Sequence, residues 1–439
     1  MAPSNRSARS RWLDRARSIF SFFVPAYSVF ASRVNWVWLV CSVTLLSASH
    51  LLMPVSAQAP ESRAESLRQQ RADKAKSLTP YKPSTLEAAL TVAEDKAIAA
   101  LGREGFYPKL GSITTDSGFS LGAGFRNSPV FKHQGTLNLW AAGSLKGYWA
   151  IEGRAVFPDL AKGRLFAEGW ATRRTYPQEI FFGIGPDSRR SDQVNFALRT
   201  VAFGGRGGVR PVKPIRVGVG VEHIQPSVGH GTDTRASSIE ALFGDATAPG
   251  LIRQPTYLHP SVFVEVDYRQ PLNARKGGWY RIEFSRYEDR DFDAYSFGRV
   301  DVDLRQFVSF LTERRVIAGR AYVSTSSANA GQAMPFYLMP YLGGSDTLRG
   351  FREYRFRGPH ALLLQGEYRY EIWSGLEGAF FYDAGKVARQ RSDLDLKNLE
   401  RDYGFGFRFN TDNGVVVRVD AGFGSRDGKH LYIRFGGVF

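Results

Sequence analysis

The 439-residue sequence predicts an all-β protein, a transmembrane antiparallel β-barrel of sixteen strands with a short N-terminal helical extension. From about residue 104, apolar and polar residues alternate along segments of roughly ten residues, which suits strands with one face in lipid and the other in a wet lumen. Long and short connections alternate along the chain. Tyr, Trp and Phe gather near many strand ends, as in the aromatic girdles of membrane barrels.

Composition excludes several other classes of protein. The only cysteine, Cys41, lies in an N-terminal apolar segment, so a disulfide framework and a Cys-based zinc site are excluded. The formal net charge is +16, but the Lys and Arg residues are thinly spread and form no sustained block, so nucleic acid is not expected as a partner.

No motif for catalysis or for a cofactor is present. The histidines lack the HExxH spacing, and there is no G-x-S-x-G. GGRGG at 204–208 leads into no helix, so we expect barrel glycines there and not a phosphate-binding loop. We therefore expect a protein that is not an enzyme, with no catalytic residue, no metal and no cofactor.

Residues 1–57 are predicted to be a secretory signal peptide. An Arg-rich start is followed by a mostly apolar segment at 34–55 and by the small residues SAQA at 56–59, which favour cleavage after Ala57. The alternative is a membrane anchor that is retained. A lipoprotein is excluded because Cys41 comes too early in the apolar segment.

Residues 58–104 are predicted to be a periplasmic linker with one short helix at 84–101. STLE at 84–87 has the pattern of a capping box, and Gly102 suits the C-terminal end of a helix. The helix is a spacer or a plug inside a pore. We favour the spacer.

The barrel is predicted over residues 105–439. In RVDVDLR at 299–305, for example, Val300 and Val302 lie on the face opposite Asp301 and Asp303. A soluble sandwich also alternates, but its strands are shorter, and its polar faces do not carry both charges on strand after strand. Sixteen strands are predicted, at 105–114, 117–127, 134–144, 147–157, 163–174, 192–206, 212–224, 257–270, 277–287, 297–310, 315–326, 361–373, 376–386, 402–411, 413–423 and 430–439. The segment at 105–114 is the weakest of these predictions, because it contains a proline and alternates poorly.

The connections are expected to follow the rule of membrane barrels, with long loops outside the cell and short turns in the periplasm. The long connections are predicted near 175–191, 225–256, 288–294, 327–360, 386–401 and 424–429. The short ones are predicted near 158–162, 207–211, 271–276, 311–314, 374–376 and 411–414.

The last strand carries a predicted C-terminal assembly signal. Its apolar residues alternate and are expected to share the lipid face, ending on a terminal aromatic residue: Leu431, Ile433, Phe435 and Phe439.

Three segments in order carry a family resemblance. They are PFYLMPYLGGSDTLRGFREYRFRG at 335–358, LLLQGEYRYEI at 362–372 and AFFYDAGKV at 379–387. Together they resemble the Omp85 superfamily, of the bacterial surface antigen D15 type. The resemblance implies that a long loop folds back into the lumen and carries a tip of Leu348, Arg349, Gly350 and Phe351. It also implies an inward-facing Glu367 on the next strand and an F-x-D-x-G strand of Phe381, Asp383 and Gly385.

The alternation leads to the same charged residues. Glu367 and Asp383 fall on the lumen faces of neighbouring strands, where their mutual repulsion calls for a cation. An arginine carried in by the loop supplies one, with a fork of donors that matches carboxylates. Gly343 and Gly344 allow the backbone to turn tightly beside it. We call this predicted set the loop lock, comprising Leu348, Arg349, Gly350, Phe351, Glu367 and Asp383; the alternative is an exposed arginine on a flexible loop.

The resemblance implies a role in inserting β-barrel proteins into the outer membrane of a Gram-negative-type bacterium, or in moving polypeptides across it. Family members are expected to open a seam between the first and last strands. The expected partners are outer-membrane lipid, unfolded barrel or exported polypeptide clients, and a separate periplasmic partner. The rival hypothesis is a passive transport pore or surface-antigen barrel without insertase activity.

The sequence departs from the family in one respect. Members carry periplasmic POTRA domains before the barrel, and residues 58–104 are too short for one such domain. We therefore expect that client capture would need a separate partner, or that insertase activity has been lost.

Overall fold

The computed structural model describes residues 104–114, 117–130, 135–269, 274–373, 375–411 and 414–435. The chain divides into two units, residues 1–83 and residues 84–439. The predicted signal peptide and the helix predicted at 84–101 lie outside the described residues.

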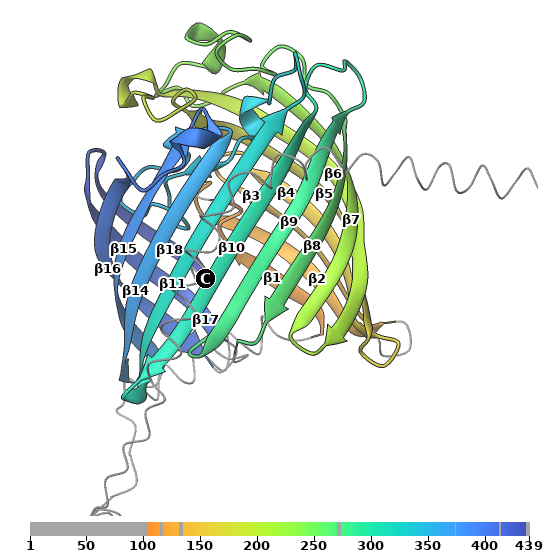
Figure 1. Ribbon diagram of the computed structural model, residues 1–439, viewed down its shortest axis with the longest axis vertical. Helices are drawn as coiled ribbons and strands as arrows, with labels where there is room; N and C mark the ends of the chain where they lie inside the picture. Colours follow the sequence, from red (N-terminus) through yellow and green to blue (C-terminus); the bar gives the residue numbers. More distant parts are fainter. Residues whose placement is uncertain are drawn as a thin grey trace, which may run out of the picture. The chain divides into compact units, whose positions relative to one another are not determined.

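The described part of the second unit is dominated by one sixteen-stranded antiparallel sheet, which curves into a nearly closed barrel (Figure 1). Each strand pairs with the next in sequence, except that β11 pairs with β14 across the longest connection. The strands are β1 (Gly105–Gly111), β2 (Ser120–Val130), β3 (Gly135–Ser144), β4 (Trp149–Leu160), β5 (Leu165–Phe181), β6 (Val194–Val212), β7 (Ile215–His230), β8 (Tyr257–Asp267), β9 (Gly277–Asp289), β10 (Phe297–Phe310), β11 (Thr312–Ala328), β14 (His360–Trp373), β15 (Leu376–Ala388), β16 (Glu400–Thr411), β17 (Gly414–Ser425) and β18 (Gly428–Phe435).

The predicted fold class and strand number are confirmed. Even the weakest prediction, the segment at 105–114, forms a strand: β1 pairs with β2 along its whole length, from Gly105 opposite Arg126 to Gly111 opposite Ser120. The sheet order is that of an up-and-down barrel, in which sequence neighbours are also spatial neighbours.

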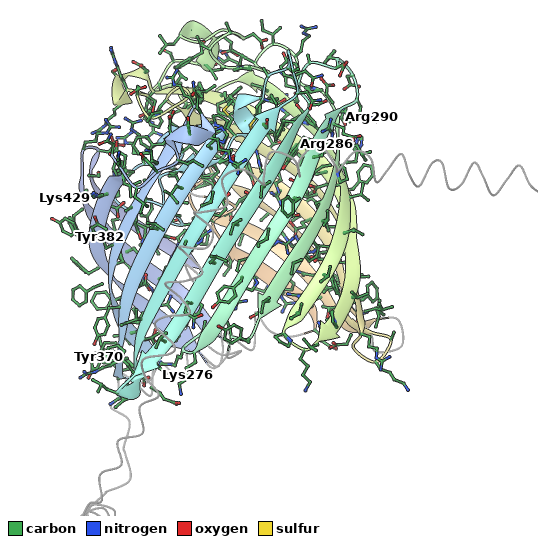
Figure 2. All side chains as sticks on the ribbon, in the orientation of Figure 1. Lys276, Arg286, Arg290, Tyr370, Tyr382 and Lys429 are labelled. Atoms are coloured by element: carbon green, nitrogen blue, oxygen red, sulfur yellow. The ribbon has the colours of Figure 1, made fainter. Side chains whose placement is uncertain are left out.

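The wall has an apolar outer face and a polar inner face. On β15, Phe380 is 66% exposed, whereas Asp383 on the opposite face is fully buried. Tyr370 and Tyr382 lie on the outer side of the wall (Figure 2). Because a soluble protein would place these two classes of side chain the other way round, the outer face suits lipid.

The short turn predicted at 207–211 is wrong. β6 continues to Val212, and the chain turns at Lys213 and Pro214. The glycines of GGRGG lie within the strand, as expected. Glycine is needed there because the neighbouring backbone leaves no room for a side chain, and a Cβ on Gly208 would overlap the carbonyl oxygen of Val217.

The long connections on either side of β6 and β7 also start later than predicted. β5 extends to Phe181 and β7 to His230, so the loops predicted at 175–191 and 225–256 lose their first residues to strands. Their aromatic and apolar residues remain in the sheet and contribute to a packed cluster at this end of the barrel.

The two ends of the barrel differ. The long connections gather at one end, called here the long-loop end, where Arg286 and Arg290 lie, and Lys276 lies at the opposite, short-turn end (Figure 2). The longest connection, residues 329–359, is called the long loop. It contains a two-stranded sheet, β12 (Tyr341–Leu342) with β13 (Phe356–Arg357), which the sequence did not predict.

The helical structure that is described consists of short 3-10 turns, Arg190–Asp192, Ile239–Ala241, Phe336–Leu338 and Arg391–Asp393. Within the described ranges, none of the helices is long and apolar enough to span a bilayer.

Candidate functional site

The tip of the long loop is a compact turn built on two glycines. Gly343 and Gly344 have φ values of +109° and +102°, a region that residues with a side chain rarely adopt. The Gly344 N–H donates to the carbonyl oxygens of Leu348 and Phe351, each at 3.1 Å. A Cβ on Gly344 would overlap the Glu353 carboxylate, so the motif glycines are required both by backbone conformation and by space.

Arg349 lies between Glu367 of β14 and Asp383 of β15, the arrangement expected from the sequence. Its Nε and Nη2 donate to the two carboxylate oxygens of Asp383, at 2.7 and 2.8 Å. Its Nη1 donates to Glu367 Oε2 at 2.6 Å. All three side chains are 0% exposed. The guanidinium therefore makes a bidentate and a single charge-assisted contact without competition from water.

An aromatic ring completes the pocket around this guanidinium. The Cζ atom of Arg349 lies 3.5 Å from the ring centroid of Phe381, the first residue of the F-x-D-x-G motif. A desolvated cation–π contact of this kind is worth about 2 kcal/mol. Phe381 and Asp383 both face inward because they are two residues apart on β15, so one strand supplies a ring and a carboxylate to the same cation.

The ionic network extends further than the sequence analysis predicted. Glu367 accepts hydrogen bonds from three arginines, with Arg369 Nε at 2.7 Å and Arg408 Nη2 at 2.9 Å in addition to Arg349. Arg408 also donates from Nη1 to Asp420 at 2.6 Å. The period of two puts Asp420 on the inner face of β17, but the strand pattern contains no signal that this residue lies level with the loop tip.

Arg418 connects β17 to the loop backbone. Its Nη2 donates to the carbonyl oxygen of Ser345 at 2.9 Å and also contacts the Asp346 carboxylate. Arg418 and Arg408 are both 1% exposed, although alternation predicts a wet lumen wall. The loop therefore covers this part of the wall and removes it from water.

Apolar packing surrounds the ions. Leu348 and Phe351 are fully buried, and the rings of Phe351 and Phe356 meet at 5.2 Å between centroids and 65° between planes. They pack with Leu342 of the loop against Leu363 and Val387 of the wall. Full burial of each such side chain contributes about 1.5–3 kcal/mol, so the tip is held by packing as well as by charge.

Two glycines allow the loop backbone to reach the wall. A Cβ on Gly422 of β17 would overlap the carbonyl group of Arg349, and a Cβ on Gly350 would overlap Asp402 Cβ on β16. The backbone contact continues towards the last strand, where the Tyr432 hydroxyl donates to the Phe351 carbonyl oxygen at 2.6 Å. Gly385 plays a similar part on β15, because a Cβ there would lie 3.0 Å from Leu342 Cδ1.

The first half of the long loop is attached elsewhere. The ring of Phe336 lies 4.9 Å from those of Phe181 on β5 and Phe196 on β6, measured between centroids. The Phe336 N–H donates to the Pro249 carbonyl oxygen at 2.9 Å, and Arg299 of β10 contacts the Leu338 carbonyl oxygen. The long loop thus has an apolar attachment to the β5–β10 side and an ionic attachment to β14–β18.

The residues of the predicted C-terminal assembly signal lie away from this site. Leu431 and Ile433 are exposed on the outer face of β18. Phe435 is the last described residue of that strand, and Phe439 lies outside the described residues. In the described part of the chain, no group of His, Cys, Asp and Glu side chains is placed to hold a metal ion.

The sequence of residues 279–427 matches the model of the Omp85 superfamily domain. These residues include the long loop, β14 and β15, which carry the motifs identified from sequence. In sequence, none of the curated proteins compared with the chain matches it.

Solved structures are similar to the chain at low sequence identity. BamA from Haemophilus ducreyi lacking POTRA domains 1–3 has a TM-score of 0.53 and 12% identity, with 79% of this chain and 77% of that chain covered. CdiB from Escherichia coli has a TM-score of 0.49 and 14% identity over 75% of this chain and 61% of that chain. CdiB from Acinetobacter baumannii has a TM-score of 0.47 and 13% identity over 76% and 59%.

Proposed function

The chain contains an Omp85 superfamily domain within a sixteen-stranded barrel, and from this premise we propose that it inserts β-barrel proteins into, or moves polypeptides across, the outer membrane of a Gram-negative-type bacterium. In this proposal the clients are unfolded polypeptides, and a separate periplasmic partner delivers them. The barrel carries out no covalent chemistry. The long loops face the outside and the short turns face the periplasm.

The observation that carries the proposal is the pair of sheet edges at the ends of the strand order. β1 and β18 stand at opposite ends of the sixteen-strand order, and no hydrogen-bonded pairing joins them among the described residues. Over the described residues, β1 has 7 residues and β18 has 8, against 11 and 12 in their partners β2 and β17. An unpaired edge in a membrane wall offers its backbone N–H and C=O groups to an incoming strand, so it can template a client by strand addition.

The loop lock is well placed to support one of these edges. The long loop contacts β18 through the bond of Tyr432 to Phe351 and the ion pair of Arg434 with Asp346 at 3.4 Å. It contacts β17 through Arg418 and through Ser425, whose hydroxyl donates to the Gly350 carbonyl oxygen. A docked loop thus fixes the C-terminal edge while a client pairs with the seam.

Reconstitution into liposomes tests the proposal. The full chain in the bilayer should accelerate the folding and insertion of an unfolded outer-membrane barrel, measured by its resistance to protease and its shift in gel mobility. Liposomes with the same amount of a barrel of unrelated family are the control. Insertion no faster than in the control liposomes would contradict the proposal.

The second candidate is a passive pore, and a specific feature of the lumen favours it. The inner faces of β4, β5 and β6 carry arginines that remain about one-third exposed or more, Arg154, Arg174 and Arg206. Charged side chains that keep water beside them suit an ion path. Steady ion conductance in planar bilayers without accelerated insertion of the client would support the pore in place of the insertase.

A further inference from the structure

A second aspartate stands directly beside the loop lock. Asp402 of β16 is the cross-strand partner of Asp383 on β15, and both side chains point into the lumen. Their exposed fractions are 1% and 0%. Directly opposite residues of an antiparallel pair have Cβ atoms about 4.5–5.5 Å apart, so two carboxyl groups share one dry site.

The two carboxyl groups differ in their partners. Asp383 accepts the fork of Arg349 and, at 3.2 Å, the amide of Gln365. Neither oxygen of Asp402 has a hydrogen-bond partner among the described residues. Asp383 on the neighbouring strand and Gly350 of the loop tip both stand against Asp402, since Asp383 is its cross-strand partner and a Cβ on Gly350 would overlap Asp402 Cβ.

The surrounding cations are committed to other carboxylates. Arg349 is bound to Asp383 and Glu367. Arg408, which lies on β16 like Asp402, is bound to Glu367 and Asp420. Arg418 on β17 points to Asp346 and also approaches Asp420, and towards the long-loop end Glu400 pairs with Arg426 at 2.6 Å. Asp402 is therefore the one acid of this described network without an arginine of its own.

An ionised carboxylate in that position would be both desolvated and without a donor, and a buried group in this situation takes up a proton instead. We infer that Asp402 is a neutral carboxylic acid when the loop is docked and that it donates its proton to Asp383. Asp383 remains ionised and keeps its bidentate contact with Arg349. The loop lock then consists of an arginine, two carboxylates and one proton.

The proton makes docking of the loop dependent on pH. When the loop leaves, water reaches Asp402, which then ionises at about pH 4 like an ordinary aspartate. The docked state thus binds one more proton than the released state, so rising pH favours release. Losing this proton in the docked state would place two adjacent anions beside one guanidinium. The ionic attachment is strongest in mild acid and weakens towards alkaline pH.

Infrared spectroscopy tests the proton directly. The full chain, folded in detergent and held at neutral pH, should show a C=O stretching band of a protonated carboxylic acid above the carboxylate bands. That band should disappear in Asp402→Asn and persist in the control Asp303→Asn. Asp303 is also a lumen-facing aspartate, but Arg305 and Arg320 both bind it, so it should be ionised. A wild-type spectrum without the band, or a band that survives Asp402→Asn, would overturn the inference.

Proteolysis tests the consequence. Chymotrypsin cleavage within 335–358 should become faster with rising pH in the wild type, by up to about tenfold per pH unit, because one proton separates the two states. Asp402→Asn keeps the size, the neutrality and a donor for Asp383, so the ratio of wild-type cleavage to Asp402→Asn cleavage should rise with pH. The ratio of wild-type cleavage to Asp303→Asn cleavage should be independent of pH, because the control keeps the proton on Asp402. Equal pH dependence in wild type and Asp402→Asn would count against the role of this proton.

Discussion

The two halves of the lumen wall use the same side chains in different surroundings. On β4–β6, Arg154, Arg174 and Arg206 pair with glutamates while 34–41% of each side chain stays exposed. On β16 and β17, Arg408 and Arg418 also pair with acids, but they are 1% exposed. The second half lies beneath the tip of the long loop, which excludes water from it.

The difference shows that cover by the loop, and not the wall itself, determines how much a charged pair contributes to stability. A solvated pair of this kind contributes about 0–1 kcal/mol, because water competes for both ions and salt screens them. Breaking a dry pair by removing one partner costs about 3–5 kcal/mol, because the other ion is left desolvated and alone. The same type of mutation should therefore reduce stability strongly beneath the loop, on β16 and β17, and only slightly on the solvated strands β4–β6.

Arg349→Ala should have the largest effect. It leaves Asp383 and Glu367 without their shared cation and should weaken docking of the loop tip by about 3–5 kcal/mol, less if water enters. The barrel should remain folded while chymotrypsin gains access to sites within 335–358. Arg154→Ala on the solvated half is the matched control and should leave cleavage unchanged.

Arg349→Lys sharpens this prediction. Lysine keeps the charge but not the planar fork that spans both carboxylate oxygens of Asp383. Cleavage should fall between that of the wild type and that of Arg349→Ala. Cleavage of Arg349→Ala at the wild-type rate would mean that the tip is held by its apolar residues alone.

Phe336→Ala should affect the other attachment of the long loop. Removing a fully buried ring from between Phe181 and Phe196 costs about 3–5 kcal/mol when the cavity does not collapse. Hydrogen exchange should rise at residues 333–342 and stay low at 348–351, because the ionic attachment is independent of this cluster. A matched increase in both segments would show that the two attachments form one cooperative unit.

Gly422→Ala should have an intermediate effect. A methyl group there would overlap the Arg349 carbonyl, and overpacking of this kind costs about 1–3 kcal/mol. Gly169→Ala is the control, because the nearest atom to a Cβ at that position is 3.8 Å away. The thermal midpoint of loop protection should fall for Gly422→Ala only. Equal midpoints for both variants would mean that the loop backbone can move away from β17 at no measurable cost.

The sequence predicted the wall well and its hydration poorly. Alternation located fifteen of the sixteen strands, because the lipid face and the lumen face impose a period of two on each of them. The segment at 105–114 alternates poorly and was predicted as a strand because barrels of this kind have an even number of strands. The family motifs led to Arg349, Glu367 and Asp383. They gave no indication that Arg369, Arg408 and Asp402 lie in the same dry network, since a polar residue on an alternating strand has the same pattern whether a loop covers it or water does.

Turns were located least well where glycines are needed inside a strand. GGRGG looks like a turn locally, and only the close approach of β5 and β7 makes these residues part of β6. The two-stranded sheet in the long loop was missed for a related reason. Its strands, β12 and β13, have two residues each, too few to show any period.

The smallest predicted effect gives the most direct test of the comparison. Glu168 binds two arginines, Arg154 and Arg206, and Glu367 binds three, so both glutamates are well paired. Glu168→Gln should change the free energy of unfolding by about 1 kcal/mol or less, and the change should shrink further at high salt. Glu367→Gln should reduce stability by several-fold more and with little response to salt, because screening does not reach a dry pair. If the two variants were equally destabilised and equally sensitive to salt, water would have access beneath the loop. The number of arginines around each glutamate, and not the cover provided by the loop, would then determine how much the glutamate contributes to the free energy of unfolding.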